Sequence, residues 1–285
     1  MKKTLLKTRG EIVNINQHKL HLYRSGNPNK PKLVFMSGSG TICPVYDFKV
    51  LYEKLLKDFR IIVIEKFGYG YSDIFENDCH IDNLVSIQKE ALSILGEKGP
   101  YILVPHSMSG LEAIRWAQKF PEDIHAIIGL DMATPISYER GFSPEIIEKK
   151  LKMIQILKKL KIQSLVCQIN NRSLTKEEKK QHQLLRKRNA LNICIEQESK
   201  QVLENAEILR NCKNPEVPAL LFSSSGKFSP DYWVKSQKDF AKTINGRLHF
   251  LQCGHYLHHF KSEEISKEIK NFVAELKLNQ TENPS

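Results

Sequence analysis

The segment that decides the expected fold is Tyr101-Ile102-Leu103-Val104-Pro105-His106-Ser107-Met108-Ser109-Gly110. Its first four residues form an apolar run typical of a strand buried on both faces, and residues 111–120 predict a helix that is apolar nearly all round. A serine on so sharp a strand-to-helix turn projects its hydroxyl above the sheet, where the helix N-terminus favours negative charge. The segment therefore predicts a nucleophile, Ser107, although a serine that only caps the helix fits this segment equally well.

Similar apolar runs recur along the chain and are separated by helical patterns. They lie at residues 32–36, 61–64, 126–130, 219–222 and 248–251. Such runs suit a parallel sheet that helices cover on both faces. The weak alternation of residues 11–24, followed by a turn cluster at 24–29, predicts an opening antiparallel hairpin. The spacing of apolar residues over 265–273 predicts a last surface helix.

The alternation of strands and helices stops between about residues 134 and 214, where Lys and Glu are frequent. Two helix starts are recognisable there. Ser143-Pro144 fits an N-cap followed by proline at the first helical position, and Thr175-Lys176-Glu177-Glu178 fits a capping box. We therefore expect an α/β core domain of residues 1–133 and 215–285, with a helical cap or lid of residues 134–214 inserted into it.

Three motifs resemble those of the α/β-hydrolase family. His106-Ser107-Met108-Ser109-Gly110 resembles the nucleophile elbow, with Pro105 where glycine is usual. Ser37-Gly38-Ser39-Gly40-Thr41 resembles the His-Gly-x loop, and residues 64–73 resemble the Asp-x-x-Gly-x-Gly-x-Ser turn, with Glu65 for the aspartate and a structural role. The resemblance covers about residues 10–133 and 215–275. It implies a mostly parallel central sheet with helices on both faces, and a serine hydrolase of the esterase or lipase type.

The resemblance also implies the groups that serve Ser107. The backbone N–H groups of Ser39 and Met108 would form the oxyanion hole, and His255 of a Gly-His pair after the last strand would act as the base. The rival interpretation is a zinc site, because His255 clusters with Cys253, His258 and His259. No second group of ligands with typical spacing accompanies this cluster, so we interpret His258 and His259 as helix-start or surface residues.

The third member of the triad is displaced in this sequence. The loop after residues 219–222 usually carries the acid, but here it holds Gly226 or Lys227 at that position. Some members of the family place the acid one strand earlier, where Asp131 ends a predicted strand. Asp231 is the alternative, although it is explained as the first-turn acid of a capped helix. We predict that Asp131 fixes the tautomer of His255 and stabilises its cation.

Composition limits the remaining function classes. The net charge is +11, but the lysines are scattered and many have acidic neighbours, which indicates a solvated basic surface rather than a nucleic-acid interface. The six cysteines include no CxxC pair, so we expect free thiols in a reducing compartment. No apolar run approaches the length of a membrane helix, and the apolar stretch near the N-terminus is only Leu5-Leu6. We therefore expect a cytoplasmic monomer or homodimer that binds neither nucleic acid nor membranes.

The predicted reaction is acyl transfer to water through an acyl-enzyme on Ser107. It needs no cofactor and no metal, and its partner is a small-molecule acyl substrate, in the first instance a carboxylic ester. Hydrolysis of thioester, lactone, peptide or carbon–carbon bonds stays open, as does a non-catalytic ligand-binding protein on the same fold. A nucleophilic aspartate, which dehalogenases and epoxide hydrolases of this fold use, is excluded because position 107 is serine.

Overall fold

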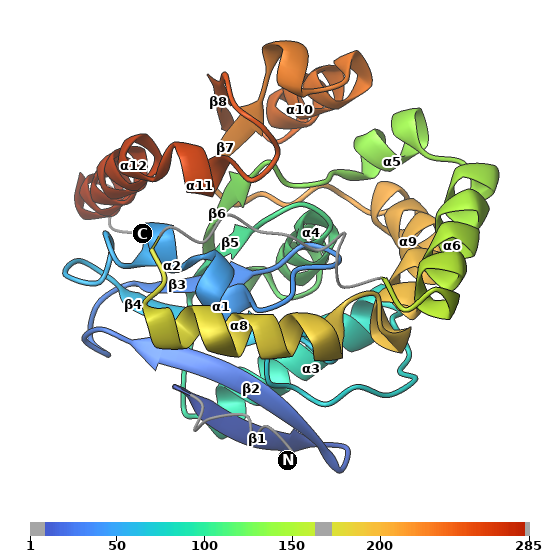
Figure 1. Ribbon diagram of the computed structural model, residues 1–285. Coiled ribbons are helices and arrows are strands. Elements are labelled where there is room, and N and C mark those ends of the chain that lie inside the picture. Colours follow the sequence, from blue (N-terminus) through green and yellow to red (C-terminus); the bar gives the residue numbers. More distant parts are fainter. Residues whose placement is uncertain (1–8, 163–172, 283–285) are drawn as a thin grey trace.

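The computed structural model describes residues 9–162 and 173–282, and these form one eight-stranded sheet between layers of helices (Figure 1). The sheet has the order β1-β2-β4-β3-β5-β6-β7-β8. Its strands are β1 (Glu11–Ile15), β2 (His18–Ser25), β3 (Lys32–Met36), β4 (Arg60–Glu65), β5 (Tyr101–Pro105), β6 (Ile124–Leu130), β7 (Ala219–Ser224) and β8 (Arg247–Leu251). All neighbours from β4 to β8 pair in parallel, whereas β2 is antiparallel to both β1 and β4. The mostly parallel sheet is therefore confirmed.

The first two strands form the expected antiparallel hairpin. Its turn lies at Asn16 and Gln17, whose φ values of 50° and 69° give the tight left-handed geometry that matches the twist of the strands. The turn cluster at residues 24–29 instead ends β2 and leads into β3. The hairpin therefore lies at the predicted place but turns earlier than that cluster.

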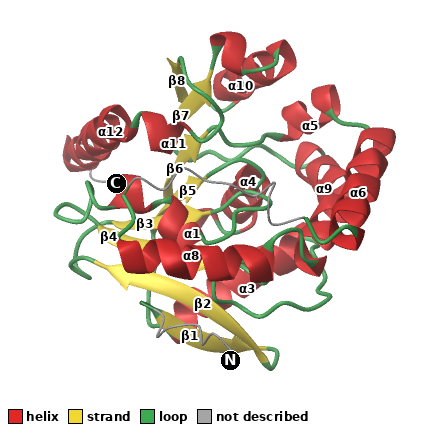
Figure 2. Cartoon of the chain, viewed as in Figure 1, coloured by secondary structure: helices red, strands yellow, loops and turns green. Residues whose placement is uncertain are grey.

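Helices cover both faces of the sheet because successive strand residues point to opposite sides (Figure 2). Val34 and Met36 face a core that includes side chains of α3 (Ile81–Ile94), α4 (Ser109–Lys119) and α10 (Asp231–Thr243). Leu33 and Phe35 face a second core with α1 (Pro44–Asp47), α2 (Lys49–Tyr52) and α12 (Ser262–Glu282). The short helices η1 (Pro121–Asp123), η2 (Gly226–Phe228) and α11 (Leu257–Phe260) lie in the connections.

Between β6 and β7 the chain forms four described helices. They are α5 (Pro135–Gly141), α6 (Pro144–Lys159), α8 (Lys176–Asn189) and α9 (Ile193–Arg210). Ser143 caps α6 ahead of Pro144, and Thr175 and Glu178 form the capping box of α8, as the sequence indicates. The helix α9 packs against α4, α5 and α6. The division into a core and a cap domain stays a prediction.

Two further expectations concern cysteines and membranes. Cys43, Cys79, Cys194, Cys212 and Cys253 are all free thiols, and Cys167 lies outside the described residues. In the described part of the chain, no helix has both the length and the apolar character needed to cross a bilayer.

Parallel strands end at the same edge of the sheet, and this edge collects the predicted site residues. Ser39 follows β3, Ser107 follows β5, Asp131 follows β6 and His255 follows β8. Residues far apart in the sequence thus meet where open α/β sheets place their ligands.

Candidate active site

Ser107 lies on a sharp turn between β5 and α4. Its φ of 55° is in the left-handed region, which non-glycine residues seldom adopt and which is typical of a strained nucleophile elbow. Pro105 fits before this turn because it is the last residue of β5, paired in register with Met36. The next N–H, that of His106, donates to the carbonyl oxygen of Met36 at 2.9 Å, so the backbone pairing continues past the proline.

Ser109 and Gly110 fasten the elbow to its neighbours. The Ser109 hydroxyl donates to the carbonyl oxygen of Met36 at 2.7 Å and accepts from the N–H of His106 at 3.1 Å. A Cβ on Gly110 would lie 2.2 Å from the carbonyl oxygen of Ala133, so only glycine allows α4 to approach the segment after β6 this closely. Ser109 therefore links the elbow to the end of β3.

His255 connects Ser107 to Asp131. Its Nε2 lies 2.9 Å from the Ser107 Oγ, and its Nδ1 lies 2.7 Å from the Asp131 Oδ2. Because a carboxylate only accepts, Nδ1 carries the proton and Nε2 accepts the hydroxyl proton of Ser107. The side chain of His255 is 41% exposed, whereas that of Asp131 is fully buried. The imidazole ring of His255 is therefore partly exposed to solvent, while the carboxylate that holds it is buried.

Asp131 is held by donors from two later elements. Its Oδ1 accepts from the Ser224 N–H at 2.9 Å and from the Trp233 indole N–H at 2.8 Å, and its Oδ2 accepts from the Ser224 hydroxyl at 2.6 Å. Burial raises the pKa of Asp131, but the hydrogen bonds from His255, Ser224 and Trp233 and the charge of His255 outweigh it. The pKa therefore lies below its usual value, and the carboxyl group stays ionised.

The structure brings Asp131, and not Asp231, to His255. Asp231 is an exposed residue at the start of α10. Sequence reasoning did not identify Ser224 and Trp233 as partners of Asp131. The sequence did contain one signal, the run Ser223-Ser224-Ser225 at the loop that usually carries the acid. These serines can donate hydrogen bonds but the loop has no carboxylate at the expected position, which indicates that the accepting carboxylate comes from another strand.

The loop after β3 lies directly against the nucleophile. A Cβ on Gly38 would lie 2.5 Å from the Ser107 Cβ and 3.1 Å from its Oγ, so this close approach requires glycine. The next backbone N–H belongs to Ser39. On the other side, Met108 is the N-cap residue of α4. Within the described ranges, neither the Ser39 N–H nor the Met108 N–H has a hydrogen-bond acceptor, so both are available to a ligand oxygen.

Comparison with known proteins gives the family. The family described as alpha/beta hydrolase fold matches residues 31–151. The protein YbdG of Bacillus subtilis (strain 168) is 31% identical over 287 residues, which cover 96% of this chain and 88% of that protein. The chain belongs to the α/β-hydrolase family.

Solved structures of α/β-hydrolases share the whole fold. An enol-lactonase from Burkholderia xenovorans has a TM-score of 0.71 at 18% identity and covers 93% of this chain and 100% of its own. A loop variant of the haloalkane dehalogenase DbeA from Bradyrhizobium elkanii has a TM-score of 0.72 at 16% identity, with 95% and 98% covered. At such identities the likeness concerns the fold and not the reaction. The predicted fold and family are confirmed.

Glu65 organises the α/β-hydrolase turn after β4. Its buried carboxylate accepts from the N–H of Tyr71 at 2.8 Å and from the N–H of Val45 at 3.2 Å, and lies 2.8 Å from the His21 Nδ1. Burial raises the pKa of Glu65, but His21 outweighs it and the pKa is lowered. A Cβ on Gly70 would overlap this carboxylate. These contacts agree with the structural role expected for the turn.

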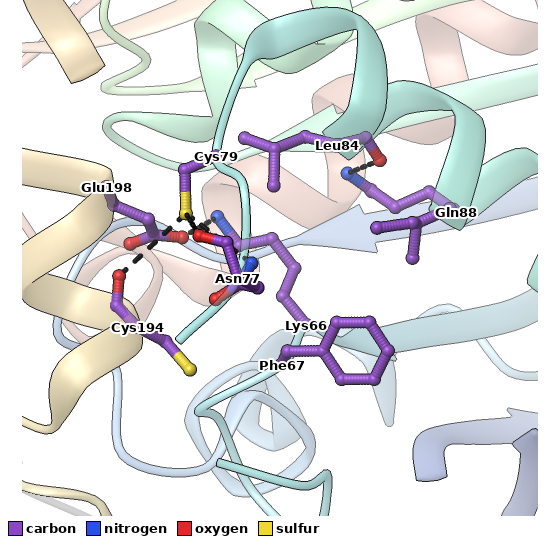
Figure 3. A pocket seen from close by; sticks show the side chains of 9 residues that line it. Lys66, Phe67, Asn77, Cys79, Leu84, Gln88, Cys194 and Glu198 are labelled. Atoms are coloured by element: carbon purple, nitrogen blue, oxygen red, sulfur yellow. Dashed lines mark hydrogen bonds and ion pairs between the residues drawn. The ribbon is translucent and has the colours of Figure 1, made fainter. Parts of the chain in front are cut away.

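The same turn contributes Lys66 to a buried cluster of ionisable groups. The Lys66 Nζ lies 2.6 Å from the Glu112 Oε1 of α4 and 2.7 Å from the Glu198 Oε1 of α9. Burial lowers the pKa of Lys66, but the two glutamates outweigh it and raise the pKa. Figure 3 shows Lys66 and Glu198 at the wall of a small cavity that Gln88 of α3 also lines. The cluster therefore joins α9 to the core.

For the histidines after His255, the structure supports the helix-start interpretation and not the surface interpretation. His258 and His259 do lie in α11, but His258 is fully buried and His259 is largely so. Their Nε2 atoms lie 2.9 and 2.8 Å from the two carboxylate oxygens of Asp47 in α1. Among the described residues these three groups could hold a metal ion, a set that differs from the cluster of Cys253 and His255 considered above. Both carboxylate oxygens of Asp47 therefore already have hydrogen-bond partners. Burial raises the pKa of Asp47, but the two histidines outweigh this effect, and the pKa lies below its usual value.

Proposed function

We propose that this α/β-hydrolase is a serine hydrolase that cleaves a carboxylic ester through an acyl-enzyme. The observation that carries the proposal is the continuous chain of hydrogen bonds from Ser107 through His255 to Asp131, with heavy-atom distances of 2.9 and 2.7 Å. A hydroxyl, a base and an acid at these separations satisfy the geometric requirement for an activated nucleophile.

In the first half of the reaction, the Ser107 Oγ bonds to the carbonyl carbon while its proton passes to the His255 Nε2. The carbonyl oxygen becomes an oxyanion that the N–H groups of Ser39 and Met108 stabilise. Asp131 stabilises the imidazolium that forms. His255 then gives its proton to the oxygen of the leaving alcohol as the carbon–oxygen bond breaks, which leaves the acyl group on Ser107.

In the second half, a water molecule takes the place of the alcohol. His255 accepts a proton from this water, whose oxygen attacks the acyl carbon, and returns the proton to the Ser107 Oγ as the ester bond to the enzyme breaks. The product is a carboxylic acid, which ionises. Water and the side chains and N–H groups of this chain supply every proton transfer in this scheme, and a small-molecule acyl compound is the proposed substrate.

A fluorophosphonate probe tests this proposal, because such probes phosphonylate an activated serine. We expect the native protein to be labelled at Ser107, and Ser107→Ala to lose both labelling and hydrolysis of p-nitrophenyl acetate, with kcat lower by about 10⁴-fold or more. The matched control is Ser86→Ala on α3, whose hydroxyl donates to the carbonyl oxygen of Asp82 in its own helix. A folded native protein that remains unlabelled contradicts the proposal and favours a ligand-binding protein on this fold.

A further inference from the structure

The cleft beside Ser107 and His255 has aromatic walls. Its volume is about 230 Å³. One wall comes from the segment between β6 and β7, and the other comes from the segment after β7. The larger apolar and aromatic residues that line it are Tyr138, Phe142, Phe228, Pro230, Tyr232 and Trp233.

The rings of these walls hold one another in place. The Phe142 ring lies 4.8 Å from that of Tyr138 and 6.4 Å, nearly perpendicular, from that of Tyr232. A Cβ on Gly141 would lie 2.1 Å from the Tyr232 ring, so the glycine lets the two walls meet. Trp233 stands edge-to-face against His255 at 5.7 Å. The aromatic surface therefore extends up to the proposed base.

The described residues that line the cleft include no charged side chain beyond the proposed triad. Among the described lining residues, the acidic and basic side chains are Asp131 and His255, which already bind each other. Burial raises the pKa of Tyr138 and of Tyr232, so both phenols stay neutral near pH 7. The described lining residues thus include no Lys or Arg that would pair with a carboxylate or phosphate on the substrate.

We infer that the cleft binds the aromatic ring of an uncharged ester, an inference that rests on the proposed serine hydrolase function. Aromatic rings favour offset or edge-to-face contacts with one another over contacts with a saturated ring of similar size. The walls provide both orientations, since Phe142 and Tyr232 are nearly perpendicular. Burial of a charged group in the same space is unfavourable because no described lining residue outside the proposed triad compensates its lost hydration.

The test compares esters that differ either in the ring or in one carboxylate on the ring. On the alcohol side these are benzyl, cyclohexylmethyl and 4-carboxybenzyl acetate, and on the acyl side they are ethyl phenylacetate and ethyl cyclohexylacetate. In at least one series we expect kcat/KM to be about 3- to 10-fold higher for the aromatic ring than for the saturated ring. The carboxylated ester should be slower than benzyl acetate by about 10-fold or more. Equal values for aromatic and saturated rings in both series, or a preference for the carboxylated ester, overturn the inference.

Two variants locate the preference in the cleft. Phe142→Leu keeps an apolar side chain but removes the ring, so it should bring the aromatic-to-saturated ratio of kcat/KM close to 1, and Tyr232→Leu should act in the same direction. The control is Ile94→Ala, which removes an exposed apolar side chain at the end of α3 and should leave the ratio unchanged. An unchanged ratio in both cleft variants overturns the inference. Failure of fluorophosphonate labelling marks failure of the proposed function, whereas a labelled protein without ring preference contradicts only the aromatic cleft.

Discussion

The two carboxylate oxygens of Asp131 have different partners. The Oδ1 accepts from the Ser224 N–H and the Trp233 indole, whereas the Oδ2 faces the Nδ1 of His255 and also accepts from the Ser224 hydroxyl. An asparagine could keep the contacts of Oδ1 while turning an NH₂ group toward the ring. His255 would then have to accept at Nδ1 and carry its proton on Nε2, where it could no longer take the proton of Ser107.

Replacement of Asp131 therefore tests the acid by itself. For Asp131→Asn we expect kcat for p-nitrophenyl acetate to fall by about 10³- to 10⁴-fold with little change in thermal stability, because the wrong tautomer of His255 is favoured. Steady-state kinetics and a thermal melt measure the two effects. The control is Asp231→Asn, which should keep kcat within about 2-fold because this residue is exposed and outside the proposed triad. If Asp131→Asn stays fully active, the acid has been assigned to the wrong residue.

At the scale of elements, three distant segments meet at the hydroxyl of Tyr69. This oxygen accepts from the N–H of Gly40 at 3.2 Å and donates to a carboxylate oxygen of Glu198. Gly40 follows Ser39 in the proposed oxyanion loop, and Glu198 belongs to α9, which Lys66 also binds. Burial raises the pKa of Tyr69 well above its usual value, so the hydroxyl remains a donor. The contact links the segment between β6 and β7 to the loop beside the nucleophile.

Loss of that hydroxyl should loosen the loop, provided that Ser39 acts as proposed. For Tyr69→Phe we expect kcat to fall by about 10-fold while KM changes by less than about 2-fold, because an oxyanion donor that is poorly aligned weakens the transition state more than substrate binding. Glu198→Gln, which can still accept from Tyr69, should lose less.

Tyr71→Phe is the control in the same turn, since the Tyr71 hydroxyl pairs with that of Tyr46 and not with the loop. It should leave kcat unchanged within about 2-fold. Equal losses of kcat in both tyrosine variants, or a change in KM alone, would show that Tyr69 does not position the loop.

At the scale of the whole molecule, buried histidines make the stability of the fold depend on pH. Burial lowers the pKa of His182 to about 4, and it also lowers the pKa of His106 and His258. In the unfolded chain these groups titrate near their ordinary value of 6.5. Below pH 6.5 the unfolded state therefore binds more protons than the folded state, so the free energy of unfolding decreases as the pH falls toward 4.

We expect acid to destabilise the native protein in this window, and His182→Gln to reduce the effect. The full slope for one such histidine is about 1.4 kcal/mol per pH unit. Between pH 7.5 and 5.5 the midpoint of thermal unfolding should fall by about 2–4 °C less in the variant than in the native protein. Melting curves at both pH values measure this, and an identical fall in the two proteins would rule out titration of His182 as a contributor.

Much of the fold could be predicted because its signals are local. The buried strands appear as contiguous apolar runs, and the caps of α6 and α8 consist of residues within four positions of one another. Contacts between residues that are far apart in the sequence leave no local pattern of this kind. The sequence left a helix start and a surface place open for His258, and its burial in the helix α11 depends on Asp47, a carboxylate 211 positions away. Burial of a polar side chain depends on a partner, and a partner of this kind is visible only after folding.

The sequence by itself determined the parallel sheet, the serine at its elbow and the histidine after its last strand, because each depends on neighbours along the chain. Only the tertiary structure decided which aspartate reaches that histidine. The carboxylate of Asp131 is enclosed by Ser224 and Trp233, while Asp231 remains in solvent. The same holds for the aromatic cleft and for the contact from Tyr69 to Glu198. Their geometry depends on how strands and helices pack against one another. Apolar periodicity predicts which face of an element is buried, but it does not predict which other element packs against that face.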